Sequence, residues 1–201
     1  MPKATAILRQ CRRAIEDQQL LKVLKSEIAY ELSSDRFKDH AINPPVGFVM
    51  EWDAPQSQDV LLRRKCETGE EIAVSAMLGP VILETECVFP REVSMKVSLK
   101  NPDLPSVLQF DCGVFAKSVE GSEIDIRSAY FLQSPTAWGP SIYKGPPLET
   151  LDLFQSKLLE FLVAKGVGSD LTDFLLFYLH KKEQDQYVKW LQKLESIIAC
   201  Q

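Results

Sequence analysis

The residues best suited to catalysis are few in this sequence, and their surroundings do not favour it. His40 falls in a polar loop, and His180 precedes two lysines near the expected end of a helix, where a cation is electrostatically favoured. Ser141 and Lys144 have the SxxK spacing of one class of nucleophilic hydrolases, but their segment is rich in proline and glycine, whereas that class needs the motif on a helix. We expect solvated or capping roles for the histidines and predict that the protein is not an enzyme.

Motifs for phosphates and cofactors are incomplete. Gly166 and Gly168 begin a GxG pattern, but Leu171 occupies the position of the third glycine, and the segment lies between two expected helices rather than after a strand. The GxxxxGK phosphate loop does not occur. Glu84 and Glu86 share one face of an expected strand, as many surface acids do. The sequence therefore predicts no bound cofactor.

The cysteines offer the nearest approach to a metal site. Cys66, Cys87 and Cys112 fall at inward positions of expected strands, so their thiols could converge if those strands were neighbours. No CxxC pair accompanies them, although structural zinc sites usually contain one. A buried free cysteine behaves as a small hydrophobic residue, and this interpretation is favoured, so no metal is predicted. Five cysteines at irregular spacings also indicate a reducing, intracellular compartment rather than a secreted disulfide framework.

Charge is unevenly distributed along the chain. The net charge is −5, but residues 1–14 carry +4 and no acid, so the remainder carries −9. A mildly acidic body favours basic partners over nucleic acid. The run Arg63, Arg64 and Lys65 forms no three-charge patch, because strand geometry sends Arg64 to the opposite face. The apolar runs are too short to span a bilayer.

The basic segment 1–16 has two interpretations. On a helix, Ile7, Cys11 and Ile15 would share one face, and the arginines would lie largely off it, which is typical of a short mitochondrial presequence. Alternatively, the segment is the lead-in to the first structural helix. That helix is predicted over Asp17–Leu32, with Asp17 as its N-cap and apolar residues at spacings of three and four.

The middle of the chain changes to a period of two. Val93, Met95, Val97 and Leu99 alternate with polar residues, as in a half-buried strand. Turn signals, among them Gly79-Pro80, separate the expected strands. Because such short connections cannot hold crossover helices, the strands should run antiparallel. The pattern predicts about seven strands: Gly47–Trp52, Asp59–Cys66, Glu71–Leu78, Val81–Phe89, Val93–Leu99, Leu108–Val114 and Ile124–Leu132.

Helical periodicity returns after a linker rich in proline and glycine. One helix starts near Leu151 and stops at Gly166, a second starts at Ser169, and a last one fits Glu183–Ile198. The expected fold is therefore α+β: a twisted antiparallel sheet with one N-terminal helix and two or three C-terminal helices. We expect a single domain over residues 17–198.

Several segments resemble one family. The C-terminal run has a glycine turn at Gly166, then Phe174-Leu175, Lys182-Glu183, Tyr187 and Trp190-Leu191, which is similar to the closing helices of the mitochondrial acidic matrix protein family, also called the mitochondrial glycoprotein family. DQQLLKVLKSEIAYEL resembles the first helix of that family, and LQFDCGVF and IDIRSAYFL resemble its last strands. The early strands look like those of a plant member. The resemblance covers about residues 17–198.

The resemblance implies a fold and a role. Members of the family have a seven-stranded antiparallel sheet, form ring-shaped homotrimers in the mitochondrial matrix, and act as binding or chaperone-like proteins that support mitochondrial gene expression and respiration. No catalytic residue carries over. The alternative role is an RNA- or ribosome-associated factor in the same organelle. This sequence departs from the family in its 53–58 connection, DAPQSQ, which is short and carries one acid.

The terminal helices carry the candidate interface. Both have strong apolar stripes, and a single sheet face is too limited to cover them, so we expect them to pack on each other. The resemblance implies that they also help to hold a homotrimer. Packing within one chain alone is the other possibility for the aromatic residues. The predicted interface residues are Leu24, Ile28, Tyr187, Trp190, Leu191 and Leu194.

Overall fold

The structure is a computed structural model that describes residues 3–34, 37, 43–81, 89–117, 121–133 and 142–200. By its internal contacts the chain divides into two units. Residues 1–38 and 183–201 make up the helical unit, and residues 39–182 make up the sheet unit. The expected single domain over 17–198 stays a prediction.

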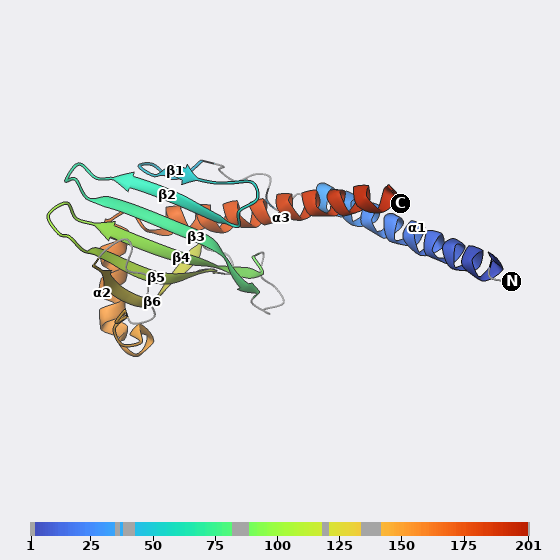
Figure 1. Ribbon diagram of the computed structural model, residues 1–201. Helices are drawn as coiled ribbons and strands as arrows, with labels where there is room; N and C mark the ends of the chain where they lie inside the picture. The colour runs from blue at the N-terminus through green and yellow to red at the C-terminus, as the bar shows by residue number, and fades with distance from the viewer. Residues whose placement is uncertain are drawn as a thin grey trace. The chain divides into compact units, whose positions relative to one another are not determined.

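The sheet unit contains six described strands in one antiparallel sheet, in which each strand pairs with its neighbour in sequence (Figure 1). This confirms the α+β class and the antiparallel order, with six described strands where about seven were predicted. Of the predicted strand Val81–Phe89, residues 82–88 lie outside the described residues. The strands are β1 Val49–Trp52, β2 Asp59–Lys65, β3 Glu71–Val81, β4 Arg91–Lys100, β5 Val107–Ala116 and β6 Ser122–Leu132.

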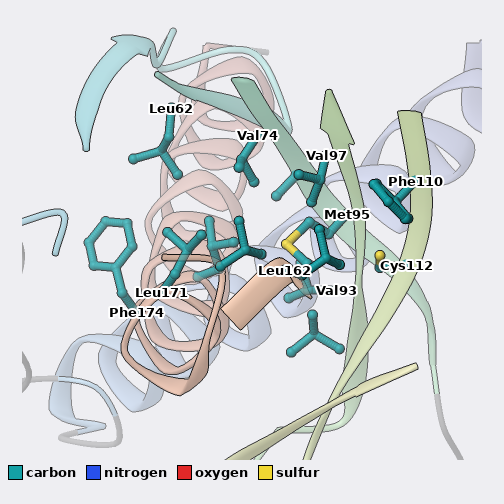
Figure 2. Packing of buried hydrophobic residues seen from close by; sticks show 14 of the residues in the cluster. Leu62, Val74, Val93, Met95, Val97, Phe110, Cys112, Leu162, Leu171 and Phe174 are labelled. Atoms are coloured by element: carbon teal, nitrogen blue, oxygen red, sulfur yellow. The ribbon is translucent and has the colours of Figure 1, made fainter. Parts of the chain in front are cut away.

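One face of the sheet forms the core, as the alternation predicts. Met95 of β4 lies between Ala76 of β3 and Cys112 of β5 in the register, and all three are buried. Helix α2, Asp152–Ala164, and the first half of α3, Ser169–Ala199, pack against this face. Figure 2 shows Leu162 of α2 and Leu171 of α3 directed toward the strand residues.

The turn predicted at Gly79-Pro80 is wrong, because both residues belong to β3. The register between β3 and β4 shifts between Leu78 and Val81, which marks a bulge at this point. Strand β2 pairs with β3 only as far as Met77, so the missing N–H of Pro80 falls beyond the end of that ladder. Proline is tolerated in strands at such bulges and edges.

The helix boundaries also differ from the prediction. Helix α1 spans Lys3–Ser33, so Asp17 lies inside it and is not its N-cap. The second and third C-terminal helices are one helix, α3, of 31 residues. Neither α1 nor α3 contains glycine or proline, so nothing in their sequences interrupts the backbone hydrogen bonds. A short 3-10 turn, η1 Leu148–Thr150, precedes α2.

The junction between α2 and α3 is built around Gly166. Its N–H donates to Val163, and the N–H of Val167 donates to Leu162, each over 2.9 Å. These two bonds form a Schellman motif, which needs a left-handed residue at this position, and Gly166 has φ of +85°. The stop predicted at Gly166 is thereby explained.

The helical unit consists of α1 and the second half of α3. Leu24 and Ile28 of α1 pack on Leu191 of α3 in a small buried cluster, with the partly buried Leu194 and Ile198 at its border. Gln184 donates to the carbonyl of Glu31 over 3.2 Å. The contacts pair the two helices in opposite directions. No helix in the described part of the chain is both long and apolar enough to cross a membrane.

Candidate functional site

The second face of the sheet is polar and carries an open hollow of about 820 Å³. Across neighbouring strands, Ser75 lies opposite Lys96, Lys96 opposite Asp111, and Asp111 opposite Ser128. Directly opposed residues share a face of a sheet, so these side chains form one polar row. The row begins on β3 and ends on β6. We treat this face as the candidate site of the sheet unit.

Asp111 is the centre of a hydrogen-bonded cluster on this face. Its carboxylate accepts from Lys144 over 2.9 Å, from the Tyr130 hydroxyl over 3.0 Å and from Ser128 over 3.1 Å. The buried side-chain amide of Gln109 donates to the Tyr130 oxygen over 2.7 Å. The Lys144 ammonium also lies 4.8 Å from the centre of the Tyr130 ring. The linker residue Lys144 is thereby attached to the sheet.

The electrostatics of this cluster keep each group in its ordinary charge state near neutral pH. Burial alone would raise the pKa of Asp111, but the hydrogen bonds from Lys144, Tyr130 and Ser128 outweigh it and lower the pKa below its usual value. The bond to Asp111 raises the pKa of Lys144, and burial together with Asp111 raises the pKa of Tyr130. General acids and bases work best when their pKa is near the working pH, and the pKa shifts of Asp111, Lys144 and Tyr130 move these groups further from neutral pH.

A second ion pair crosses three strands. Arg127 of β6 donates to Glu92 of β4 over 2.6 and 3.2 Å, and the Glu92 side chain is only 7% exposed. Gly113 of β5 lies between them, where a Cβ would stand 2.6 Å from the guanidinium. Because Gly113 has no side chain, the Arg127 guanidinium has room to cross β5 and reach Glu92. Arg127 also lies over the Phe115 ring and contacts Asp125.

The sequence indicates which polar residues of β4–β6 share a face of the sheet, but it does not indicate their hydrogen-bond or ion-pair partners. Gln109, Asp111 and Arg127 alternate with the apolar residues of their strands, which places them on the face away from the core. Their network depends on Lys144, which comes from the linker, and on Gly113, which leaves space. Periodicity reports the face on which a residue lies and does not report its cross-strand partner.

The predicted chemical residues lie apart from this face or are buried. His180 is 3% exposed inside α3, where its Nδ1 contacts the carbonyl of Leu176 over 2.7 Å, so the expectation of a solvated or capping residue is wrong. The reason is that α3 does not end there. Arg63 bonds Glu51 and Glu71, whereas Arg64 bonds the carbonyl of Lys165, which agrees with the predicted opposite faces. The other candidates outside the described residues are His40, Glu84, Glu86 and Ser141.

The cysteines do not form a metal site in the described part of the chain. No group of three potential metal-binding side chains from His, Cys, Asp or Glu comes together among those residues. Cys66 is partly buried beside the core, and Cys87 lies outside the described residues. Cys112 is buried, and burial raises the pKa of its thiol to about 12. It therefore behaves as an apolar core residue.

The predicted interface residues divide into two groups within the helical unit. Leu24, Ile28 and Leu191 are buried in the helix pair. Trp190 is 56% exposed and Tyr187 is 37% exposed, and their rings stack with centres 6.1 Å apart. Leu194 is partly buried beside the cluster. The aromatic pair is thus the part of the predicted interface that is open to a second protein.

Comparison with known proteins identifies the group to which this fold belongs. The family model described as mitochondrial glycoprotein matches residues 89–198, which is more than half of the chain. The chain belongs to the mitochondrial glycoprotein family. The matched region of this family member includes β4, β5, β6, α2 and nearly all of α3, and therefore the polar cluster around Asp111 and the Trp190 surface.

Two relatives extend the match over nearly all of this mitochondrial glycoprotein family member. An uncharacterized mitochondrial protein of Arabidopsis thaliana is 25% identical over 202 residues, which cover 92% of this chain and 76% of the relative. A solved structure of a hypothetical protein from Leishmania major, described as a sequence homologue of human p32 protein, has a TM-score of 0.70. It is 18% identical and covers 91% of this chain and 99% of its own, so the likeness concerns the fold alone.

Proposed function

We propose that this protein is a non-enzymatic binding or chaperone-like protein of the mitochondrial matrix. In this proposal it supports mitochondrial gene expression or respiratory function through protein–protein contacts. Family membership supports the mitochondrial setting. The observation that carries the role is the polar sheet face, where Asp111, Lys144, Arg127 and Glu92 are held in ion pairs. Such a face presents fixed charges to a partner and is poorly suited to proton transfer.

We further propose that the protein is a homotrimer held in part through its terminal helices. The exposed Tyr187–Trp190 pair supports this, because exposed aromatic residues are typical anchors of interfaces. In this proposal the buried leucines and isoleucine shape the helix pair, and the aromatic residues contact the next copy. The residues assigned to the interface and its support are Leu24, Ile28, Tyr187, Trp190, Leu191 and Leu194.

The binding proposal is tested by affinity purification of the tagged protein from mitochondria, with and without RNA as a competitor. We expect basic mitochondrial proteins to be retained and RNA to leave their retention unchanged. Loss of the retained proteins after treatment with ribonuclease would instead favour the RNA- or ribosome-associated role. A C-terminal fluorescent fusion that stayed in the cytosol would contradict the matrix location.

Two further measurements address the other parts of the proposal. Light scattering of the wild-type protein should give the mass of three chains, and a mass near one chain, 22.7 kDa, would refute the homotrimer. Saturable turnover of any compound that disappeared in Asp111→Asn would refute the non-enzymatic role, because Asp111 is the centre of the polar cluster.

A further inference from the structure

The sheet unit contains a second, apolar pocket of about 210 Å³ at one end of the sheet. It lies between the α2 residue Phe161, the β6 residue Phe131 and the turn residue Leu104. These three side chains are 40%, 60% and 53% exposed, which is unusual for large apolar groups gathered around one hollow. A space of this order accepts one large side chain.

The pocket lining includes two acids and two lysines. Lys165 is paired with Glu70, and Glu71, which lies opposite Lys100 in the β3–β4 register, also bonds Arg63 and Lys65. The turns that supply Glu70, Asn101 and Leu104 to the lining also carry the carboxylates of Glu67 and Asp103. Both are exposed, and neither forms a salt bridge with a described residue.

The two turns that carry these carboxylates are neighbours. A Cβ built on Gly69 would lie 3.4 Å from the Pro102 ring, so the 66–70 and 101–106 turns touch. The backbone N–H of Asp103 donates to the Asn101 side chain over 2.9 Å, which holds the turn in place. The two turns beside the apolar pocket therefore carry two exposed carboxylates.

The helical unit carries a surface of the opposite kind. Trp190 is more than half exposed and is backed by the stacked Tyr187 ring. Lys189 and Lys193 lie one turn apart on α3 beside this ring, both are exposed, and neither forms a salt bridge with a described residue. The surface is a projecting aromatic ring beside two positive charges. It matches an apolar pocket beside turns that carry two carboxylates.

We propose that Trp190 of one copy of this chain occupies the Phe131–Phe161 pocket of the next copy, with Lys189 and Lys193 facing Glu67 and Asp103. The two surfaces differ from each other, so the contact is head-to-tail, and contacts of this kind generate a ring when the rotation closes. This inference rests on the proposed homotrimer and specifies which surfaces form its interface. Buried aromatic anchors with complementary charges are the usual source of affinity and register in such interfaces.

The test is whether two variants that each fail to assemble alone form a complex when they are mixed. Trp190→Asp removes the projecting ring but leaves the pocket intact, and Phe131→Asp does the reverse. Each variant alone should scatter light as one chain, whereas the wild type scatters as three. An equal mixture should form two-chain particles, because the intact pocket of the first variant receives the intact Trp190 of the second. Val46→Asp, at a side chain that is 99% exposed, is the matched control and should remain trimeric.

The outcomes separate the pairing from the homotrimer itself. A trimeric wild type whose two variants gain no mass on mixing, at any concentration, overturns the pairing and leaves the homotrimer standing. A trimer that survives Phe131→Asp also overturns the pairing. A wild-type mass of one chain refutes the homotrimer, and the pairing with it.

Charge reversal gives a second test that keeps both apolar groups in place. The double change Lys189→Glu and Lys193→Glu should raise the protein concentration needed for assembly. Adding Glu67→Lys and Asp103→Lys to the same chain should return that concentration toward the wild-type value. If the fourfold variant assembles no better than the double variant, the assigned charge contacts are wrong. Circular dichroism establishes that each variant is folded before its mass is compared.

Discussion

At the scale of single residues, Gly166 sets the strictest limit on side-chain size at the α2–α3 junction. Its φ of +85° is costly for any residue with a Cβ, by about 1–2 kcal/mol. A Cβ would also collide with the Arg64 guanidinium, which donates to the neighbouring carbonyl of Lys165 over 3.3 Å. We predict that Gly166→Ala lowers Tm clearly in thermal unfolding. Gly168→Ala is the control, because a Cβ there meets only Val163 methyls at 3.8 Å, and equal losses for both variants would contradict this account.

The Cys112 thiol should be unreactive in the folded protein. It is buried in the sheet core, and burial raises its pKa to about 12, so the reactive thiolate is scarce at pH 8. We predict that Cys112→Ala leaves the number of thiols labelled by a disulfide reagent unchanged in native protein. In denatured protein the same variant should label one thiol fewer than the wild type. A loss of native labelling would show that Cys112 is accessible.

Asp111 should contribute to the loss of stability in acid. Its pKa is lower in the folded protein than in the unfolded chain, because its bonds to Lys144, Tyr130 and Ser128 outweigh burial. A depressed pKa contributes stability above the unfolded pKa, about 4, and the contribution is lost as pH falls through the folded pKa. Asp111→Asn should therefore be less stable than wild type at pH 7, with a smaller difference at pH 3. Urea unfolding at both pH values measures this, and a difference independent of pH would contradict it.

At the scale of elements, strands were easier to predict than helix ends. The alternation of Val93 to Leu99 gave β4 almost to its boundaries, because one face of the sheet is covered by helices and the other is open. Pro80 was misassigned, since its tolerance depends on where β2 ends. The break expected near Lys182 does not occur, because only glycine or proline would force one. These features depend on neighbouring elements, which local sequence does not contain.

The candidate functional residues also include some that were predicted from the sequence and some that were not. The apolar stripe of the last helix and the family resemblance led to Trp190 and Tyr187 as interface residues; both are exposed in the helical unit, and their role in an interface stays a prediction. The cluster around Asp111 was not predicted, because it joins strands to a linker residue 33 positions away in the chain. A periodic pattern shows which residues share a face of one element and does not show contacts between elements.

The helix pair of the helical unit should open without unfolding the sheet. Leu24, Ile28 and Leu191 form a buried cluster separate from the sheet core. Truncating a buried leucine costs about 2–5 kcal/mol, which is a large share of the stability of so small a cluster. We predict that Leu191→Ala accelerates hydrogen exchange in α1 while the β3 and β4 amides keep their protection. Gln192→Ala, at an exposed neighbour, is the control. Equal acceleration in the sheet would show that both units unfold together.

At the scale of the whole molecule, assembly should appear in thermal stability. A subunit contact present only in the folded state raises Tm with protein concentration, by mass action. We predict that the wild-type Tm rises as the protein is concentrated, and that Trp190→Asp removes this dependence. The variant should resemble the wild type most closely at low concentration, where the wild type dissociates. A wild-type Tm that is independent of concentration would contradict assembly under those conditions.

The edges of the sheet determine which forms of aggregation are open to this protein. At one edge, β1 has only four residues and a register irregularity between Met50 and Trp52. At the other, the Gln155 amide from α2 donates to the Ile126 carbonyl of β6 over 3.4 Å. Short, irregular or covered edges are poor templates for a strand from another chain. Pairing of these edge strands with a strand from another copy, and growth into amyloid-like fibres by that route, is therefore disfavoured while the fold is intact.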